Sequence, residues 1–464
     1  MLAAAAAALA LYAGLIGSGH WYGDEFYLVA LYRDNGLAAL AHHIVGWSPR
    51  PVSEPLLFLY ARLVAAMGRP LIRGVLGWLW LAFLLGSVAT VQWRKRGIAW
   101  RVAAGLSLLA MMIVSRDPSQ VFFWPVGAVA YLTAIAALTL ALFLLADGRA
   151  SSRRGNWLLT AALVAAAWCC EFGAIFGVCY GTAWLLDDML ARRKGGGRDA
   201  FAAGAVVLVL ASLLVLGLLA THRARVLNEM PDASALLLHH PLRSAIAALA
   251  ALPLDLGSES GNAVWSAASW SDLARGVLIR AAFVFGFANC WAFYRAKWRP
   301  DRRLVLFFAA GVATAWLALA ASFYQFGDLC CSRGAAFRNA LFLLGLAGIA
   351  TIVAREVLPW GRAARAIAGS ALIVSALAVS LAPQLPGLAR DYAARDTIRT
   401  ITAANWASGR AAGPAMTFRQ YPQQTIQVSY LYPPGTYRLD GNTPGYASVI
   451  MGFFHKQLLT LLAP

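Results

Sequence analysis

The sequence predicts an all-α polytopic membrane protein with about eleven transmembrane helices. Of its 464 residues, 60% are hydrophobic and only 13% are charged, which is more apolar surface than a soluble core of this size needs. Apolar stretches alternate with short charged loops along most of the chain. The net charge of +18 is spread over these loops and forms no single patch, so it indicates membrane topology and not nucleic-acid binding.

Eleven apolar stretches are expected to form the transmembrane bundle, residues 1–383. The first, MLAAAAAALALYAGLIG, has no Lys or Arg before it and so lacks the basic segment of a secretory signal. We expect it to be a retained helix, and cleavage is the alternative. In order, the stretches are residues 2–18, 72–92, 98–115, 127–146, 157–168, 172–187, 200–220, 276–294, 304–321, 336–354 and 366–383.

Basic loops indicate the orientation of this bundle. With a cytoplasmic N-terminus and eleven crossings, every basic segment falls on the cytoplasmic side, as the positive-inside rule requires, and the C-terminus falls outside. The topology depends on residues 157–187 forming two short helices around Glu171, because one long helix would invert all later spans. The basic segments are residues 94–101, 149–154, 192–198, 295–303 and 355–365.

The first outer segment, residues 19–71, contains two further helical patterns. Residues 25–44 and 53–67 are amphipathic or short, and the second carries Arg62. We expect both to be helices that lie on the outer membrane surface.

Two more segments are expected on the outer side. Residues 221–275 form a second long loop, which is polar. Residues 384–464 form a small C-terminal α/β domain. A helix near 387–408 is followed by the strand-like pieces AMTFRQY and TIQVSYLY and by the turn signals PPG, DGN and TPG.

An acidic pair follows the first apolar stretch, in the sequence GDEFYLV. Asp24 and Glu25 point about 100° apart on a helix, so only one of them can face a given cavity. In one interpretation both carboxylates cap the N-terminus of the next helix, where negative charge is stabilising. In the other, one of them faces a water-filled cleft at the membrane border and acts as a general base for a hydroxyl, or binds a divalent metal such as Mg²⁺ or Mn²⁺.

Other candidate binding residues lie at expected outer helix ends. Glu171 is an ionisable residue between two short apolar stretches, and is either functional or a border glutamate. Trp124 either belongs to an interfacial aromatic belt or stacks on a sugar ring. Arginine binds phosphate bidentately, although any one of these arginines can instead anchor the helix to lipid headgroups. The outer arginines are Arg50, Arg116, Arg333 and Arg338.

Several chemistries lack their sequence signatures. We find no GxxxxGK[ST], GxSxG, CxxC or HExxH pattern, so the sequence does not favour an ATPase domain, a serine hydrolase or a structural zinc site. The vicinal pairs Cys169-Cys170 and Cys330-Cys331 either form a disulfide or fill small apolar spaces.

Together these features resemble the GT-C superfamily of membrane glycosyltransferases. The resemblance rests on GDEFYLV after the first helix, on Trp47-Ser48-Pro49-Arg50-Pro51 in the first outer loop, and on FFWPVGAVAYL at the entry to a later helix. It is nearest to bacterial O-antigen glucosyltransferases of the GtrII type and related membrane proteins. The family-like pattern often has Gly-Arg where this chain has Pro49-Arg50.

The resemblance implies an enzyme of the bacterial inner membrane that acts at the periplasmic face. Its donor would be a sugar on polyprenyl phosphate and its acceptor an envelope glycan or lipid, with Asp24 or Glu25 as base. A donor-lipid synthase or flippase would be a further partner. The alternatives are a lipid-linked saccharide transporter, which needs charges deep in several spans, and a polysaccharide polymerase or ligase, which would use the loop 221–275.

Overall fold

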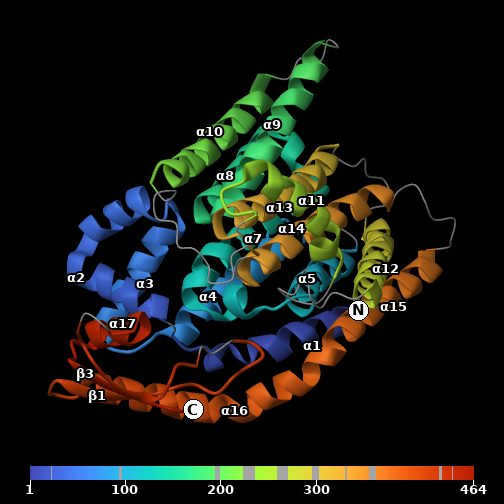
Figure 1. Ribbon diagram of the computed structural model, residues 1–464. Coiled ribbons are helices and arrows are strands. Elements are labelled where there is room, and N and C mark those ends of the chain that lie inside the picture. Colours follow the sequence, from blue (N-terminus) through green and yellow to red (C-terminus); the bar gives the residue numbers. More distant parts are fainter. Residues whose placement is uncertain are drawn as a thin grey trace.

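The protein is almost entirely helical in the computed structural model (Figure 1). The structure describes residues 1–21, 23–93, 97–193, 199–222, 236–258, 270–294, 302–329, 332–354, 362–427, 431–440 and 443–464. Every expected apolar stretch is helical over most of its length. These helices are α1 (Leu2–Ala13), α4 (Ile72–Val88), α5 (Ile98–Val114), α7 (Thr133–Ala146), α8 (Arg153–Cys169), α9 (Glu171–Arg193), α10 (Asp199–His222), α12 (Trp270–Tyr294), α13 (Arg303–Phe326), α14 (Ser332–Val353) and α15 (Arg362–Leu381).

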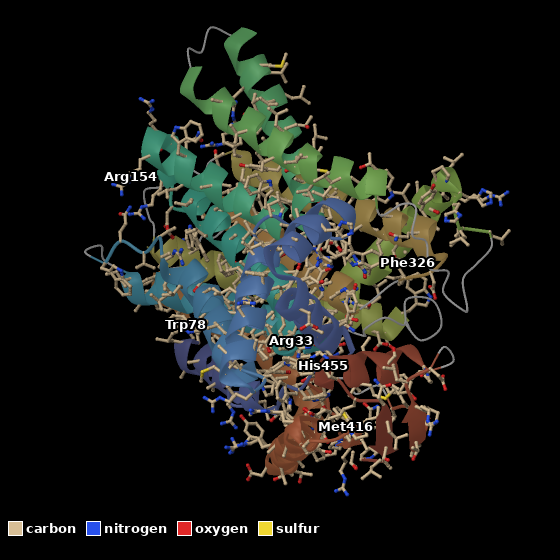
Figure 2. The ribbon with its side chains drawn as sticks, turned by 90° about the vertical axis from the view of Figure 1, so that its left-hand side faces the viewer. Arg33, Trp78, Arg154, Phe326, Met416 and His455 are labelled. Carbon is tan, nitrogen blue, oxygen red and sulfur yellow. The ribbon has the colours of Figure 1, made fainter. Side chains whose placement is uncertain are left out.

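Six helical segments among the described residues are long and apolar enough to cross a membrane, or seven if α1 and the following helix form one bent span. Helices α4 and α5 are apolar but shorter. These long apolar helices support the prediction of a membrane-embedded protein, while the count of eleven crossings stays a prediction. The outer faces of the bundle carry apolar side chains, such as Trp78 on α4 (labelled in Figure 2), which is 74% exposed.

The segment 157–187 forms two helices, as expected, but neither is among the described segments that are long and apolar enough to cross a membrane. Helix α8 ends at Cys169, Cys170 has an extended backbone (φ −157°, ψ 160°), and α9 begins at Glu171. The two helices pack against each other. They approach so closely that a Cβ on Gly173 would overlap the carbonyl oxygen of Ala166.

Both expected helices of the first outer segment are present, as α2 (Gly23–Gly46) and α3 (Ser53–Met67). Helix α2 bends at Gly36, whose φ of 61° favours glycine. It packs against α3, and together they form a unit beside the bundle (Figure 1). The segment 221–275 contains α11 (Pro241–Gly257), which packs against α13.

The C-terminal segment is an α/β unit, as expected. It consists of α16 (Leu385–Arg410), β1 (Ala415–Arg419), β2 (Gly435–Arg438), α17 (Gly445–Phe454) and β3 (Leu458–Leu462). The sheet order is β1-β3-β2, with β1 parallel and β2 antiparallel to β3. The strand expected in TIQVSYLY is absent from its described residues, and residues 428–430 lie outside the described part. Strands β2 and β3 and helix α17 were not predicted.

Aromatic packing joins this unit to the helices near the N-terminus. The Trp21 ring makes edge-to-face contacts with Phe26, Trp406 and Phe453, at centroid distances of 5.1, 5.2 and 5.3 Å. Tyr392 of α16 donates a hydrogen bond to the carbonyl oxygen of Leu11 in α1 (2.6 Å). Figure 1 shows the sheet and α17 beside α2 and α16 running along α1. The hydrophobic core is thus continuous from the bundle into the C-terminal unit.

Candidate functional site

Three cavities adjoin one another where α2, α14 and the segment before α7 meet. The tyrosine-walled cavity, of about 380 Å³, is lined by Gly23, Asp24, Tyr27, Gln120, Trp124, Arg333, Tyr432, Gly445, Tyr446 and Val449. The central cavity, of about 410 Å³, is lined mainly by Asp24, Tyr27, His43, Ser48, Arg50, Glu54, Trp124, Tyr131 and Arg333. The apolar cavity, of about 450 Å³, is lined by Tyr131, Glu171, Arg333, Arg338 and apolar side chains of α9, α10 and α13.

Shared residues show how the cavities connect. Arg333 lines all three. Asp24 and Trp124 line both the tyrosine-walled and the central cavity. Tyr131 lines both the central and the apolar cavity. The arrangement is a continuous path in which Arg333 marks the common junction.

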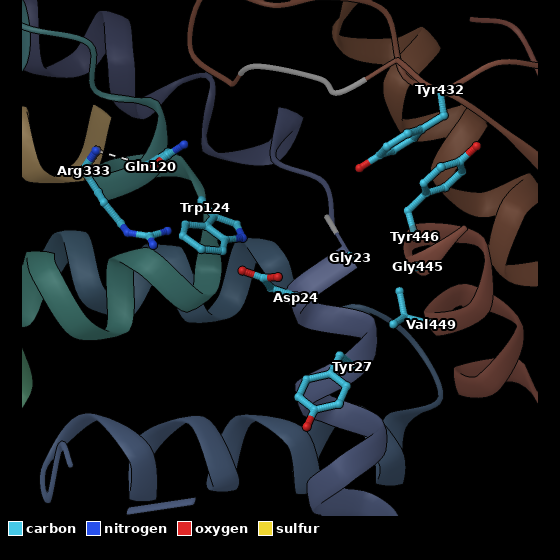
Figure 3. A pocket seen from close by; sticks show the side chains of 10 residues that line it. All are labelled: Gly23, Asp24, Tyr27, Gln120, Trp124, Arg333, Tyr432, Gly445, Tyr446 and Val449. Atoms are coloured by element: carbon cyan, nitrogen blue, oxygen red, sulfur yellow. Dashed lines mark hydrogen bonds between the residues drawn. The ribbon is translucent and has the colours of Figure 1, made fainter. Parts of the chain in front are cut away.

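The acidic pair divides between two environments. Asp24, in the first turn of α2, faces Trp124 and Arg333 across the tyrosine-walled cavity (Figure 3). Glu25 is fully buried, and one of its carboxylate oxygens accepts a hydrogen bond from the backbone N–H of Val126 (3.4 Å). Asp24 is therefore the member of the pair that can meet a substrate in these cavities.

Arg333 lies in the first turn of α14. Its backbone N–H donates to Gln120 Oε1 (3.4 Å), and its guanidinium carbon lies 5.4 Å from the centre of the Trp124 ring. No carboxylate among the described residues lies within ion-pair distance of this guanidinium. Because the group opens onto all three cavities, it can bind an anion that enters from any of them.

Arg50 and Glu171, both predicted site residues, bind each other. Arg50 donates a hydrogen bond to Glu171 Oε2 (2.8 Å), and the Tyr131 hydroxyl donates to Glu171 Oε1 (3.0 Å). Arg50 lines the central cavity and Glu171 lines the apolar one. The charge of Arg50 is thus offset, which leaves Arg333 as the stronger attractor for an anion.

One buried carboxylate, Glu54, lines the central cavity and is held by a cluster of hydrogen bonds that was not predicted. Glu54 of α3 accepts hydrogen bonds from Ser48 Oγ (2.6 Å) and from the Tyr32 hydroxyl (2.5 Å), and lies 3.2 Å from His43 Nδ1. Burial raises the pKa of Glu54, but the hydrogen bonds of His43 and Ser48 and the charge of Arg50 outweigh it and hold that pKa below its usual range.

Arg116 and Arg338, both predicted phosphate ligands, instead bind Asp255 of α11. Arg338 makes two hydrogen bonds to the carboxylate (2.7 and 2.9 Å), and Arg116 contacts its oxygen at 3.8 Å. Burial raises the pKa of Asp255, but Arg338, Arg116 and Arg280 together outweigh it and hold that pKa below its usual range. Arg116 does not line any of the three cavities, and Arg338 borders only the apolar one. The neighbour Asp117 pairs with neither arginine and accepts from the N–H of Ser119 (2.8 Å).

Aromatic rings stand on both sides of the tyrosine-walled cavity. Trp124 lies on the bundle side, beside Arg333. Tyr432 and Tyr446, from the C-terminal unit, are stacked with ring centroids 3.4 Å apart and face them across the cavity (Figure 3). The two tyrosines were not predicted as site residues, because nothing in the sequence shows that Tyr432 and Tyr446 lie near Asp24.

The described residues bear on the possible metal site, but they include only one of the two cysteine pairs. Within the described ranges, no group of three or more His, Cys, Asp or Glu side chains gathers in a way that would hold a metal ion. Asp24 and Glu25 do not converge, since Glu25 is buried against Val126. Cys169 and Cys170 are buried free thiols, and Cys330 and Cys331 lie outside the described residues.

The geometry suits a substrate that is long, amphiphilic and anionic at one point. An apolar cavity can hold a hydrocarbon chain, Arg333 a phosphate, and the two more polar cavities hydroxyl-bearing groups on either side of Asp24. In comparisons with protein-family models, curated proteins and solved structures, no match to this chain was found.

Proposed function

We propose that the protein is a membrane glycosyltransferase of the GT-C type that uses a polyprenyl-phosphate-linked sugar as donor. The proposal includes eleven crossings, a location in the bacterial inner membrane and a site that faces the periplasm. Its acceptor is a glycan or lipid of the cell envelope. The observation that carries the proposal is the junction of the three cavities at Arg333, with Asp24 on the two polar cavities only.

Each part of such a donor has a cavity of matching chemistry. The polyprenyl chain lies in the apolar cavity between α9, α10 and α13. Its phosphate binds Arg333, whose guanidinium can form two parallel hydrogen bonds to phosphate oxygens. The sugar then extends into the central cavity, and the acceptor enters through the tyrosine-walled cavity.

The reaction requires one base and one anion-binding group. Asp24 takes the proton of the acceptor hydroxyl as that oxygen attacks the anomeric carbon. The bond from the anomeric carbon to the phosphate oxygen breaks, and the electron pair leaves with polyprenyl phosphate. Arg333 stabilises the charge that develops on the phosphate. Arg50 and Trp124 border the sugar, while Arg116 and Arg338 act indirectly by fixing α11 and α14 through Asp255. The proposal requires no divalent metal at Asp24.

Two alternatives receive less support from the same geometry. None of the described residues of 221–275 lines the three cavities, which disfavours a ligase that uses this loop as its catalytic element. A transporter or flippase requires a polar route through the bundle. Here one end of the path is the apolar cavity, which offers no such polar route.

The test is transfer of a radiolabelled hexose from polyprenyl phosphate to acceptor glycan in membranes that contain the protein. We expect Asp24→Asn to lower transfer by about 10²–10⁴-fold at equal protein level, since a positioned base contributes that much. Asp396→Asn, on an 83% exposed side chain of α16, is the matched control and should transfer normally. Normal transfer by Asp24→Asn would refute the role of Asp24. Absence of transfer by the wild type across a panel of donors would refute the enzyme proposal and favour transport.

A further inference from the structure

The histidine of the central cavity has one ring nitrogen fixed by its surroundings. His43 Nδ1 lies 3.2 Å from Glu54 Oε2 and 3.2 Å from the Tyr32 hydroxyl oxygen. The hydroxyl hydrogen of Tyr32 is donated to Glu54 (2.5 Å). Both neighbours of Nδ1 are therefore acceptors, and Nδ1 must carry the hydrogen.

This tautomer leaves Nε2 as a hydrogen-bond acceptor. In a neutral imidazole, the nitrogen without hydrogen presents a lone pair. The His43 ring lines the central cavity, and no described residue hydrogen-bonds to Nε2. The ring is held firmly, because His43 is only 8% exposed and the Glu54 that binds it is 1% exposed.

The position of this acceptor is informative. Arg333 and Asp24 both line the central and the tyrosine-walled cavity, but only the central one also shares Tyr131 with the apolar cavity. A group that connects a phosphate at Arg333, with its hydrocarbon chain in the apolar cavity, to a reacting carbon near Asp24 can therefore occupy the central cavity. A sugar ring can be this connecting group, because its hydroxyl groups can donate a hydrogen bond to a neutral Nε2.

We propose that the central cavity is the donor-sugar subsite and that His43 Nε2 accepts a hydrogen bond from one hydroxyl of that sugar. Glu54 is a positioning residue, since it acts on the sugar only through His43. The inference rests on the proposed glycosyltransferase function and goes beyond it, because it states which residue selects the donor. A site built to accept a hydroxyl hydrogen rejects an analogue that lacks the hydroxyl.

Deoxy-sugar donors test this directly. The probes are a polyprenyl-phosphate hexose that the wild type uses and its monodeoxy analogues. We expect one analogue to show a kcat/KM about 10- to 100-fold lower with the wild type. His43→Phe should use that analogue and the parent hexose equally well, while still discriminating normally at the other positions. The control His42→Phe, at the neighbouring exposed histidine, should behave as the wild type.

The outcomes separate the two proposals. If His43→Phe keeps every preference of the wild type, or loses rate equally with all donors, the role of His43 is refuted. If the wild type transfers none of the hexoses, the glycosyltransferase proposal itself fails.

The same donors test the role of Glu54. Because Glu54 acts on the sugar only through His43, Glu54→Gln should weaken the preference for the parent hexose over that one deoxy analogue and leave the preferences at the other positions unchanged. An equal loss of rate with every donor would show that Glu54 is only structural.

Discussion

Replacing Asp255 by asparagine should destabilise the bundle strongly. The carboxylate is 1% exposed, and Arg116 and Arg338, which contact it, are each 3% exposed. Arg280 adds a third nearby guanidinium. Removing one partner of a buried ion pair leaves the other charge uncompensated and typically costs about 3–5 kcal/mol. We expect a loss of about this size in the free energy of unfolding, measured by tryptophan fluorescence during denaturation in detergent.

The matched variant Arg338→Met distinguishes this reasoning from a general intolerance of the site. It leaves Asp255 in contact with Arg116 and near Arg280, so no charge is left without an opposite partner. Arg338→Met should therefore cost less than Asp255→Asn. An equal or larger loss in Arg338→Met would refute the reasoning, as would an Asp255→Asn variant of normal stability.

Two further predictions concern the N-terminal loop and the α8–α9 corner. Burial lowers the pKa of His20 to about 3, although a backbone hydrogen bond opposes it. The unfolded state therefore binds a proton between about pH 6.5 and 3 that the folded state does not, and stability should fall by about 1.4 kcal/mol per pH unit as the pH drops through this window. Between pH 7.5 and 5 the melting temperature should fall less in His20→Phe than in the wild type. An equal fall in both would contradict the effect of His20. Gly173→Ala should separate α8 from α9 and reduce both the melting temperature and sugar transfer. Gly217→Ala, where a Cβ meets nothing within 4 Å, should not, so a matching loss there would contradict this packing argument.

The sequence predicts the helices well because apolar length and loop charge are local properties. All eleven stretches are mostly helical, and the break at Cys170 falls between two of them. The C-terminal unit is less predictable. β3 pairs with β1 across 43 residues, as Leu458 opposite Ala415 shows, and such long-range pairing has no local signal.

The candidate site is only partly predictable, because some of its residues have a local sequence signal and others are brought together by distant contacts. The sequence predicts Asp24 and Arg333 as site residues because a charge at the border of an apolar stretch is conspicuous, and the structure places both in the lining of the same two cavities. The sequence predicts Arg338 as a phosphate ligand because it cannot show that Asp255, 83 positions away in the chain, is the partner of Arg338. Glu54 and His43 are not predicted from the sequence, since each resembles an ordinary helix-end residue and the bend of α2 at Gly36 lies between Tyr32 and His43.

The measurement that tests the central claim most directly is donor binding by Arg333→Gln. In the proposed mechanism the donor phosphate binds Arg333, where all three cavities meet. Binding of a polyprenyl-phosphate hexose to the purified protein should weaken about 10- to 100-fold in Arg333→Gln, the amount expected for charge-assisted hydrogen bonds. Donor binding should be unchanged in Arg399→Gln, because the side chain of Arg399 on α16 is half-exposed. Donor binding by Arg333→Gln at wild-type affinity would contradict the account.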